Sequence, residues 1–272
     1  MKNVEVKIRS KYYEKRKRMA KRKKYNGLEA LIILIASLIM ALIKFIIRMI
    51  LFIYDVITIY TSKYRIKSGN GFFKTYFNKG NYGEFKLYRK VISKFGKDKV
   101  YTNVYLDNVN TDYTEIDVIA LSSHGIYVFE MKNYSGYIYG SENDQHWTQV
   151  LNRFSKNKFY NPLRQNYAHT KSVEKYLAIH ESEIIPVIVF SNHSKLSKID
   201  VGINKNVFQI KDINRFIKNN FKGKKVTFTN EKLNEFSVKL IEHSNMSQEI
   251  KDKHIIQVTN IQKNGLKSDK FM

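Results

Sequence analysis

The sequence contains no cysteine among its 272 residues, and it has only two prolines and one tryptophan. The lack of cysteine excludes disulfide frameworks, thiolate zinc sites and cysteine nucleophiles, so a bound metal would have oxygen or imidazole ligands. The seven histidines show no close paired spacing of the kind that metal ligands have. A glycine-rich phosphate loop and a Gly-x-Ser-x-Gly elbow are also missing, which leaves P-loop nucleotide hydrolysis and serine-esterase chemistry unsupported.

Acidic residues are scarce relative to basic ones. The chain has 24 Asp and Glu against 48 Lys and Arg, a formal net charge of +24. Such an excess repels itself unless an anionic partner is near, and nucleic acid and anionic lipid are the obvious candidates. Basicity alone does not choose between nucleic acid and anionic lipid. A genome rich in A and T would also raise the lysine content and lower the proline content. The length suits one folded domain with appendages.

The first 55 residues divide into a basic arm and an apolar segment. Residues 1–27 carry 12 Lys and Arg but only two acidic residues. Residues 28–55 follow as the predicted transmembrane helix, and within residues 30–54 the only charged side chains are Lys44 and Arg48. Roughly 20 apolar residues cross a bilayer, and basic side chains four residues apart on one helical face can extend to the headgroups. An interfacial helix and a buried core helix are the alternatives.

These features predict a single-pass membrane protein with an uncleaved anchor, because no small-residue cleavage site follows the apolar run. Lys and Arg are denser before the span than after it, so the positive-inside rule places the amino terminus in the cytoplasm and the following domain on the other side. Basic residues downstream weaken this asymmetry and leave the side of the domain open. Membrane lipid is a predicted partner of both the span and the basic arm.

The remainder of the chain is predicted to be a linker at 56–80, a folded domain at 81–244 and a C-terminal tail at 245–272. Periodicity and the content of branched and aromatic residues locate the elements of the domain. We expect a loop-rich stretch between residues 133 and 161, helices at 83–95, 162–179, 212–219 and 230–243, and strands at 100–109, 115–121, 126–132, 184–190 and 207–210.

Three charged residues converge in the predicted hairpin. If its turn is centred between Ser123 and His124, the numbers of paired residues sum to 247, which places Asp117 opposite Glu130. Such a pair shares one face of the sheet with Cβ atoms about 5 Å apart, and Lys132, two residues beyond Glu130, projects to the same face. Two carboxylates this close repel each other beside an apolar core. A divalent cation would relieve that repulsion.

This residue set suits phosphodiester hydrolysis. Mg²⁺ takes oxygen ligands and keeps several waters, and a metal-bound water is a stronger nucleophile. Lys132 could orient that water or stabilise the charge that develops on the phosphoryl oxygens. Glu-x-Lys is nevertheless a common triplet, so the alternative is that Asp117 and Glu130 are merely solvated or salt-bridged at the strand ends.

Several short motifs occur in order between residues 83 and 190. They are Gly83-Glu84, Glu115-Ile116-Asp117, Ser123-His124-Gly125-Ile126, Val128-Phe129-Glu130-Met131-Lys132-Asn133, Gly136, Trp147 and Asn161-Pro162-Leu163-Arg164-Gln165-Asn166. Together they resemble the nuclease-related domain (NERD) family, which is similar to the PD-(D/E)xK nucleases. Each motif alone is weak, but their order and spacing make the resemblance specific.

The resemblance implies an α/β fold with a restriction-endonuclease-like αβββαβ core and a mixed sheet, preceded here by one transmembrane helix. It also implies that Asp117 and Glu130 are metal ligands, that Glu84 joins them from the first helix and that Lys132 is the catalytic lysine. The position before the aspartate is Ile116, where the superfamily name has proline. Proline is often missing there, so this departure puts little in doubt.

Gln165 matches the family's glutamine after Asn-Pro. It shares one helical face with Pro162, Asn166 and His169, because the four follow an i, i+3, i+4, i+7 spacing. A helix packed beside the hairpin could present Gln165 to water or phosphate, whereas a solvated polar face is the alternative for Asn166 and His169. Trp147 is expected to be a packing anchor, with stacking on a base as the alternative.

The sequence therefore predicts a membrane-anchored nuclease that hydrolyses phosphodiester bonds in nucleic acid, with DNA preferred over RNA as the substrate. The expected cofactor is Mg²⁺ or Mn²⁺, and no small-molecule cofactor is expected. One alternative is a catalytically inactive, membrane-tethered module that binds nucleic acid through its basic surface, and another is a membrane-surface protein whose basic arm binds anionic lipid. The predicted catalytic residues are Glu84, Asp117, Glu130, Lys132 and Gln165, and the predicted metal ligands are Asp117, Glu130 and Glu84.

Overall fold

The computed structural model describes residues 27–108, 113–202, 205–222 and 225–244, together with residues 252, 253, 256 and 259. The predicted basic arm and C-terminal tail lie outside the described residues, apart from Gly27 in the arm and residues 252, 253, 256 and 259 in the tail. The chain divides into two compact units, residues 1–55 and residues 56–272.

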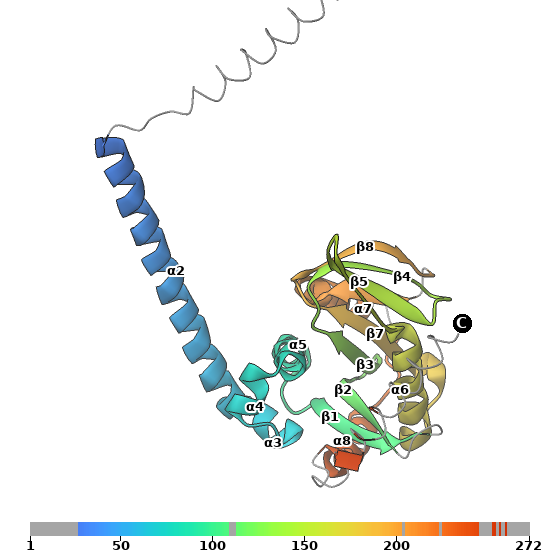
Figure 1. Ribbon diagram of the computed structural model, residues 1–272. Helices are drawn as coiled ribbons and strands as arrows, with labels where there is room; N and C mark the ends of the chain where they lie inside the picture. The colour runs from blue at the N-terminus through green and yellow to red at the C-terminus, as the bar shows by residue number, and fades with distance from the viewer. Residues whose placement is uncertain are drawn as a thin grey trace, which may run out of the picture. The chain divides into compact units, whose positions relative to one another are not determined.

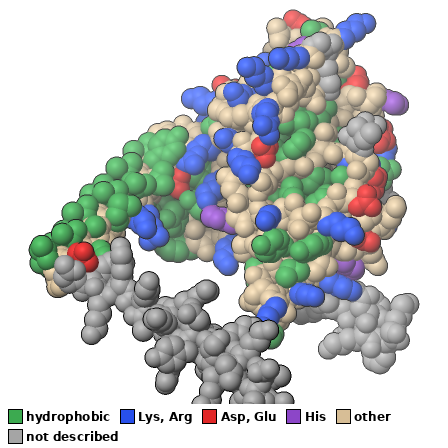
Figure 2. Space-filling model, turned by 90° about the horizontal axis from the view of Figure 1, so that it is seen from above, with side chains coloured by type: hydrophobic (Ala, Val, Ile, Leu, Met, Phe, Trp, Pro, Cys, Tyr) green, Lys and Arg blue, Asp and Glu red, His purple; other side chains and the backbone are tan. Residues whose placement is uncertain are grey.

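The described part of the first unit is the helix α2 (Gly27–Thr61), whose last residues belong to the second unit. Its 35 residues rise about 52 Å, which exceeds the hydrocarbon core of a bilayer at about 30 Å. Between residues 28 and 51 all its side chains are exposed, and in Figure 2 it is the rod of almost unbroken hydrophobic surface. By length and composition, α2 can cross a membrane.

The second unit is built on a five-stranded mixed sheet, sheet A, with strand order β1-β2-β3-β7-β9 (Figure 1). The first three strands are antiparallel neighbours, whereas β3, β7 and β9 run parallel. Together with α5 and α6 the element order is α5-β1-β2-β3-α6-β7, which confirms the predicted αβββαβ core. The strands are β1 (Val100–Asp107), β2 (Tyr113–Ser122), β3 (Gly125–Lys132), β7 (Ile184–Phe190) and β9 (Asn206–Gln209).

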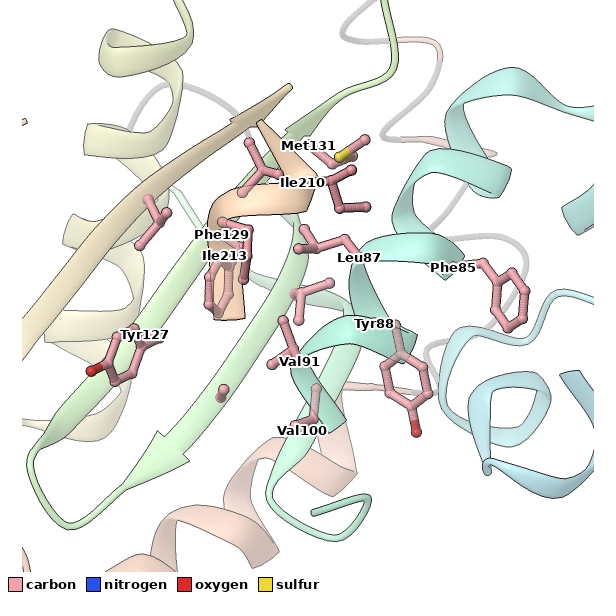
Figure 3. Close-up of a cluster of buried hydrophobic side chains, with 14 of the residues drawn as sticks. Phe85, Leu87, Tyr88, Val91, Val100, Tyr127, Phe129, Met131, Ile210 and Ile213 are labelled. Carbon is pink, nitrogen blue, oxygen red and sulfur yellow. The ribbon is translucent and has the colours of Figure 1, made fainter. Parts of the chain in front are cut away.

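Helices cover both faces of sheet A. On one face α5 and α7 form a core with the sheet, where Leu87 of α5 approaches Phe129 of β3 (Figure 3). On the other face α6 and α8 pack, with Leu177 and Leu240 in a second core. Each of the four predicted helices is therefore present. They are α5 (Lys79–Phe95), α6 (Pro162–Leu177), α7 (Ile213–Phe221) and α8 (Asn230–His243), with the short 3-10 turns η1 (Glu181–Glu183) and η2 (Ile210–Asp212).

The segment expected to be a linker, residues 56–80, contains two short helices, α3 (Tyr64–Ser68) and α4 (Phe72–Phe77). Ile59 and Tyr64 are fully buried and belong to the same core as α5. This segment is thus a packed part of the second unit.

Residues 133–161, which were expected to be loop-rich, contain three strands, so that expectation is wrong. With β8 they form a second sheet, sheet B, whose strand order is β6-β5-β4-β8. One face packs on sheet A, where Trp147 is fully buried and stacks on Phe190 with ring centroids 6.0 Å apart. The buried ring is a packing anchor and is not available to stack on a base. The strands are β4 (Gly136–Ser141), β5 (His146–Asn152), β6 (Ser155–Tyr160) and β8 (Ser194–Asp200).

Candidate active site

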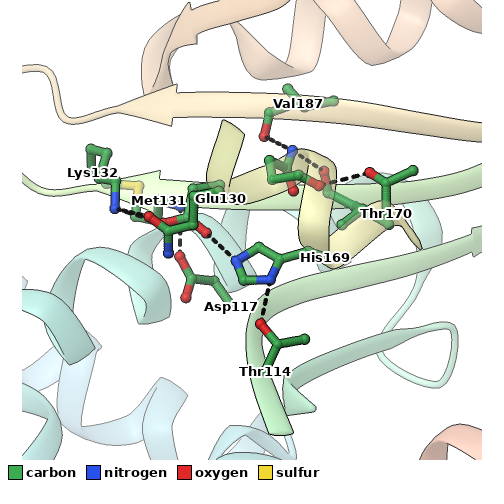
Figure 4. A network of polar contacts seen from close by, with 11 residues as sticks. Thr114, Asp117, Glu130, Met131, Lys132, His169, Thr170 and Val187 are labelled. Carbon is green, nitrogen blue, oxygen red and sulfur yellow. Dashed lines mark hydrogen bonds and ion pairs between the residues drawn. The ribbon is translucent and has the colours of Figure 1, made fainter. Parts of the chain in front are cut away.

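Glu130, near the end of β3, is the centre of a buried polar network (Figure 4). Its side chain is 2% exposed, and its Oε1 atom forms an ion pair with Nζ of Lys132 at 2.8 Å. Its Oε2 atom lies 2.9 Å from Nε2 of His169 on α6. The other ring nitrogen of His169 lies 2.8 Å from the Thr114 hydroxyl on β2. Both oxygens of Glu130 are therefore held, and His169 bridges two strands.

These contacts fix the charges of the network. Burial acts to raise the pKa of Glu130, but the Lys132 ammonium and the hydrogen bond from His169 outweigh it and hold that pKa below its usual range. Burial acts to lower the pKa of Lys132, yet the charge of Glu130 raises it overall. Glu130 is consequently an anion and Lys132 a cation at neutral pH.

The polar face of α6 supplies the partners of this ion pair. Lys132 Nζ donates to Oε1 of Gln165 at 2.8 Å, one turn of helix before His169. Asn166, between them, donates from Nδ2 to the Val128 carbonyl at 3.1 Å. Asn166 and His169 are 1% and 3% exposed, so the solvated polar face considered for them is wrong. The helical periodicity found the correct face, and this face meets sheet A.

Asp117 lies beside Glu130 in the β2–β3 hairpin. Val118 pairs with Phe129, which is the predicted register, and the ladder ends there. The Asp117 Oδ2 atom instead accepts the N–H of Met131 at 2.6 Å. Burial, and then the charges of Glu130 and Glu84, raise the pKa of Asp117 well above its usual range. Glu130 and Glu84 are thus close enough to disfavour the ionisation of Asp117.

Glu84, on α5, is linked to sheet A by the side chain of Asn103, which the sequence had not indicated as a site residue. Asn103 on β1 donates from Nδ2 to Glu84 at 3.2 Å and to Glu115 at 2.6 Å. Its backbone φ of 52° is uncommon for a residue other than glycine. Burial and the charge of Glu115 raise the pKa of Glu84, and Glu130 adds to the effect. The only sequence signal that could have pointed to Asn103 is that it is a polar residue inside an apolar strand.

Gly83 allows α5 to pack closely against the end of β3. A Cβ atom at this position would lie 2.6 Å from Cβ of Asn133, so a larger residue would push the helix away from the end of β3. Asn133 in turn donates from Nδ2 to the Lys79 carbonyl at 2.5 Å. The glycine therefore permits the approach that brings Glu84 toward Asp117.

Glu84, Asp117 and Glu130 are the residues that could hold a cation. Burial is the main cause that raises the pKa of Glu84 and Asp117, and the charges of neighbouring carboxylates add to it; a hard divalent cation with oxygen ligands would offset that carboxylate repulsion. Within the described ranges, however, no three His, Cys, Asp or Glu side chains are grouped closely enough to hold a metal ion as they stand. The donor set fits Mg²⁺ or Mn²⁺ in its chemistry, and a cation would compete with Lys132 for Glu130.

A hollow of about 390 Å³ opens beside this cluster. Lys79 and Gly80 at the start of α5 line it, together with Lys132 at the end of β3 and Gln149 and Leu151 of β5. The Lys132 side chain is 16% exposed, so a ligand in the hollow could reach its ammonium group.

Comparison with known proteins places these residues in one family. The sequence pattern described as "Nuclease-related domain" matches residues 79–191, a range that includes every predicted site residue. The chain is similar to an uncharacterized protein of Bacillus anthracis, with 32% identity over 180 residues, 65% of this chain and 82% of that protein. It is also similar to a crystal structure of a protein of unknown function, with 17% identity over 43% of this chain and 56% of that one. The TM-score of 0.26 is too low to relate the two folds.

Proposed function

The chain belongs to the nuclease-related domain family, and from this premise we propose that it is a metal-dependent nuclease that hydrolyses phosphodiester bonds in DNA. The observation that supports this most is the buried ion pair of Glu130 and Lys132, with Asp117 beside it and Gln165 holding the lysine. A buried carboxylate and lysine are costly to maintain, which favours a functional role for them.

Each residue has a role in this proposal. Lys132 is held 2.8 Å from both Glu130 and Gln165, so its ammonium has a fixed position from which it stabilises negative charge developing on a phosphoryl oxygen. Glu84, Asp117 and Glu130 would hold Mg²⁺ or Mn²⁺. When bound, such a cation neutralises phosphate charge and makes a coordinated water more acidic.

The test is cleavage of labelled DNA by the full chain in detergent, with Mg²⁺ and with EDTA. We expect Lys132→Ala to lower the rate by about 100-fold or more, the scale on which a transition-state donor acts. Lys175→Ala, which removes an exposed lysine of α6, is the matched control and should cleave as wild type does. Equal inertness of wild type and Lys132→Ala on single-stranded and double-stranded DNA, and on RNA, would refute the enzyme proposal.

A second candidate is a catalytically inactive module that binds nucleic acid. It is favoured by one observation: both oxygens of Glu130 already have partners in Lys132 and His169, so the ion pair can be purely structural. This candidate predicts salt-sensitive binding of DNA that persists in Asp117→Ala and does not depend on Mg²⁺. A Mg²⁺-dependent affinity would count against it.

We also propose that α2 anchors the domain in a membrane as a single span, with the basic residues before it contacting anionic lipid. The support is the length and apolar surface of the helix. The full chain should stay with membranes after an alkaline carbonate wash and be released by detergent. Release by the wash alone would refute the anchor.

A further inference from the structure

Sheet B has one packed face and one open face. Ile138, Trp147 and Leu196 point into the core shared with sheet A, and successive residues of a strand point to opposite faces. The residues between them consequently form the outer face. Strand pairing aligns this outer face in two rows that cross β6, β5, β4 and β8 in that order, namely Lys156, Val150, Tyr137, Lys195 and Lys158, Thr148, Tyr139, Lys198.

The outer face is basic and aromatic. Each row has lysines at both edges and a tyrosine near the centre, and all four lysines are exposed. Tyr137 is 43% exposed, and the Lys195 ammonium lies 5.2 Å from the centroid of its ring. Tyr160, 47% exposed, extends the face along β6. The four strands, all within the described residues, contain one acidic side chain, Asp200.

Figure 2 views the molecule from the side on which β4, β5 and β8 lie in Figure 1. Lys and Arg side chains are interspersed there with hydrophobic ones, and acidic side chains are fewer. The surface therefore offers positive charge and apolar rings together, on a scale of four adjacent strands.

We propose that the outer face of sheet B binds single-stranded nucleic acid. Proteins that bind single strands combine cationic side chains for the phosphates with aromatic rings on which bases stack. Strands lie about 4.8 Å apart, so the lysines of β6 and β8 stand on the order of 14 Å apart, with Tyr137 and Tyr139 between them. Stacking on these rings requires bases that are not paired in a duplex, which is why a single strand is favoured.

The candidate active site lies on the other side of sheet B from the outer face. Gln149 and Leu151, on the opposite face of β5, line the hollow that also contains Lys132. Strand β5 therefore lies between the outer face and the hollow. A single strand of nucleic acid bound on the outer face could continue over the edge of sheet B toward Lys132. The inference extends the proposed function to a substrate class, while binding itself needs none of the carboxylates.

The experiment measures binding of a short fluorescein-labelled oligothymidylate to the full chain in detergent, with EDTA to suppress cleavage. Tyr137→Ala should weaken binding about fivefold or more, the scale of one base stacked on an aromatic ring, whereas Tyr137→Phe should keep it. Lys156→Gln combined with Lys195→Gln should reduce the slope of log affinity against log salt by about 1.4, or about 0.7 for each phosphate that no longer has a cationic partner. Duplex DNA should respond less to Tyr137→Ala.

Matched controls separate a site from general attraction. Tyr167 on α6 is 56% exposed and has the Lys171 ammonium 5.5 Å from its ring centroid, so Tyr167→Ala removes a similar tyrosine elsewhere. Lys175→Gln with Lys218→Gln removes the same charge from α6 and α7. Equal losses in control and outer-face variants overturn the proposal, as does an unchanged affinity in Tyr137→Ala.

Two further outcomes are informative. If the outer-face variants lose binding to phosphatidylserine vesicles but keep oligothymidylate, the face is a membrane surface and the proposal is overturned. Fluorescence of Trp147, which points from β5 into the core between sheets A and B, verifies that each variant is folded. Cleavage that depends on Lys132 without outer-face binding would overturn this inference alone, whereas outer-face binding without cleavage would support it and overturn the nuclease.

Discussion

Removing the Lys132 ammonium should lower the unfolding free energy of the metal-free protein by about 3 kcal/mol. The Glu130 side chain is 2% exposed and its ion pair with Lys132 is 2.8 Å long, so Lys132→Met leaves a buried carboxylate with His169 as its remaining partner. Removal of one partner from a buried ion pair costs about 3–5 kcal/mol. We expect the lower end of this range because Glu130 keeps its hydrogen bond with His169. Methionine keeps the apolar stem, so little packing is lost.

Trp147 provides the assay, because it is the only tryptophan of the chain and is buried against Phe190. Thermal unfolding of the full chain in detergent, followed by its fluorescence, should show a Tm about 6–12 °C lower for Lys132→Met, since 1 kcal/mol corresponds to about 2–4 °C in a domain of this size. Lys175→Met on the exposed side of α6 should change Tm little.

The decisive comparison is the double variant Lys132→Met with Glu130→Gln. The amide carries no charge, so the double variant should be more stable than Lys132→Met alone. If it is less stable, or if Lys132→Met unfolds at the wild-type temperature, then the lysine does not compensate a buried charge and the electrostatic account of the site is wrong.

His169→Ala should weaken Mg²⁺ binding measured by calorimetry, because His169 holds the Glu130 carboxylate. His169→Asn can still donate to Glu130 and should bind Mg²⁺ better than His169→Ala; equal losses in the two variants would exclude a role for His169 in positioning Glu130. Gly83→Ala should cost about 1–3 kcal/mol through overpacking, since the new Cβ would lie 2.6 Å from a neighbouring side chain. Gly71→Ala, with nothing within 4 Å, is the control, and equal Tm values for the two would contradict the close approach. The metal-free protein should lose stability as the pH rises from about 4 toward neutral, because a carboxyl with a raised pKa, such as Asp117, binds its proton more tightly in the folded state. The lowered pKa of Glu130 contributes stability that is complete above its unfolded pKa of about 4.3 and is lost as the pH falls below that value, so a pH-independent Tm between about pH 5 and 7 would contradict the raised pKa of Asp117.

The hairpin of the candidate site could be predicted from the sequence because its turn fixes which residues lie opposite each other. The register of Val118 with Phe129 follows from that position alone. What the arithmetic could not give is the end of the ladder at this pair, where the Asp117 side chain accepts a backbone N–H of β3. Nor could it give the left-handed conformation of Asn103, since neither feature changes the pattern of apolar residues on which strand prediction rests.

Sheet B was missed because its inner face is not consistently apolar: Gly140 follows Ile138 on that face of β4, and Gln149 follows Trp147 on that face of β5. Residues such as Thr148 and Lys158 pair across β5 and β6 but supply no apolar alternation, and only the inner face carries residues such as Ile138 and Trp147. Periodicity detects a strand when one face is consistently apolar. A short strand whose outer face carries lysine and tyrosine looks like a loop by that measure, which is also why the proposed ligand surface was invisible in the sequence.

The polar face of α6 shows the converse case. Asn166 belongs to a residue type that is mostly exposed and His169 to one of intermediate burial, yet both are buried because a strand carbonyl and the Glu130 carboxylate take their hydrogen bonds. A carboxylate in a buried, apolar strand is tolerable only with such partners. The position of Glu130 in a buried strand therefore requires polar side chains to be buried opposite it, and the helix that carries Gln165, Asn166 and His169 on one face is the element that meets this requirement.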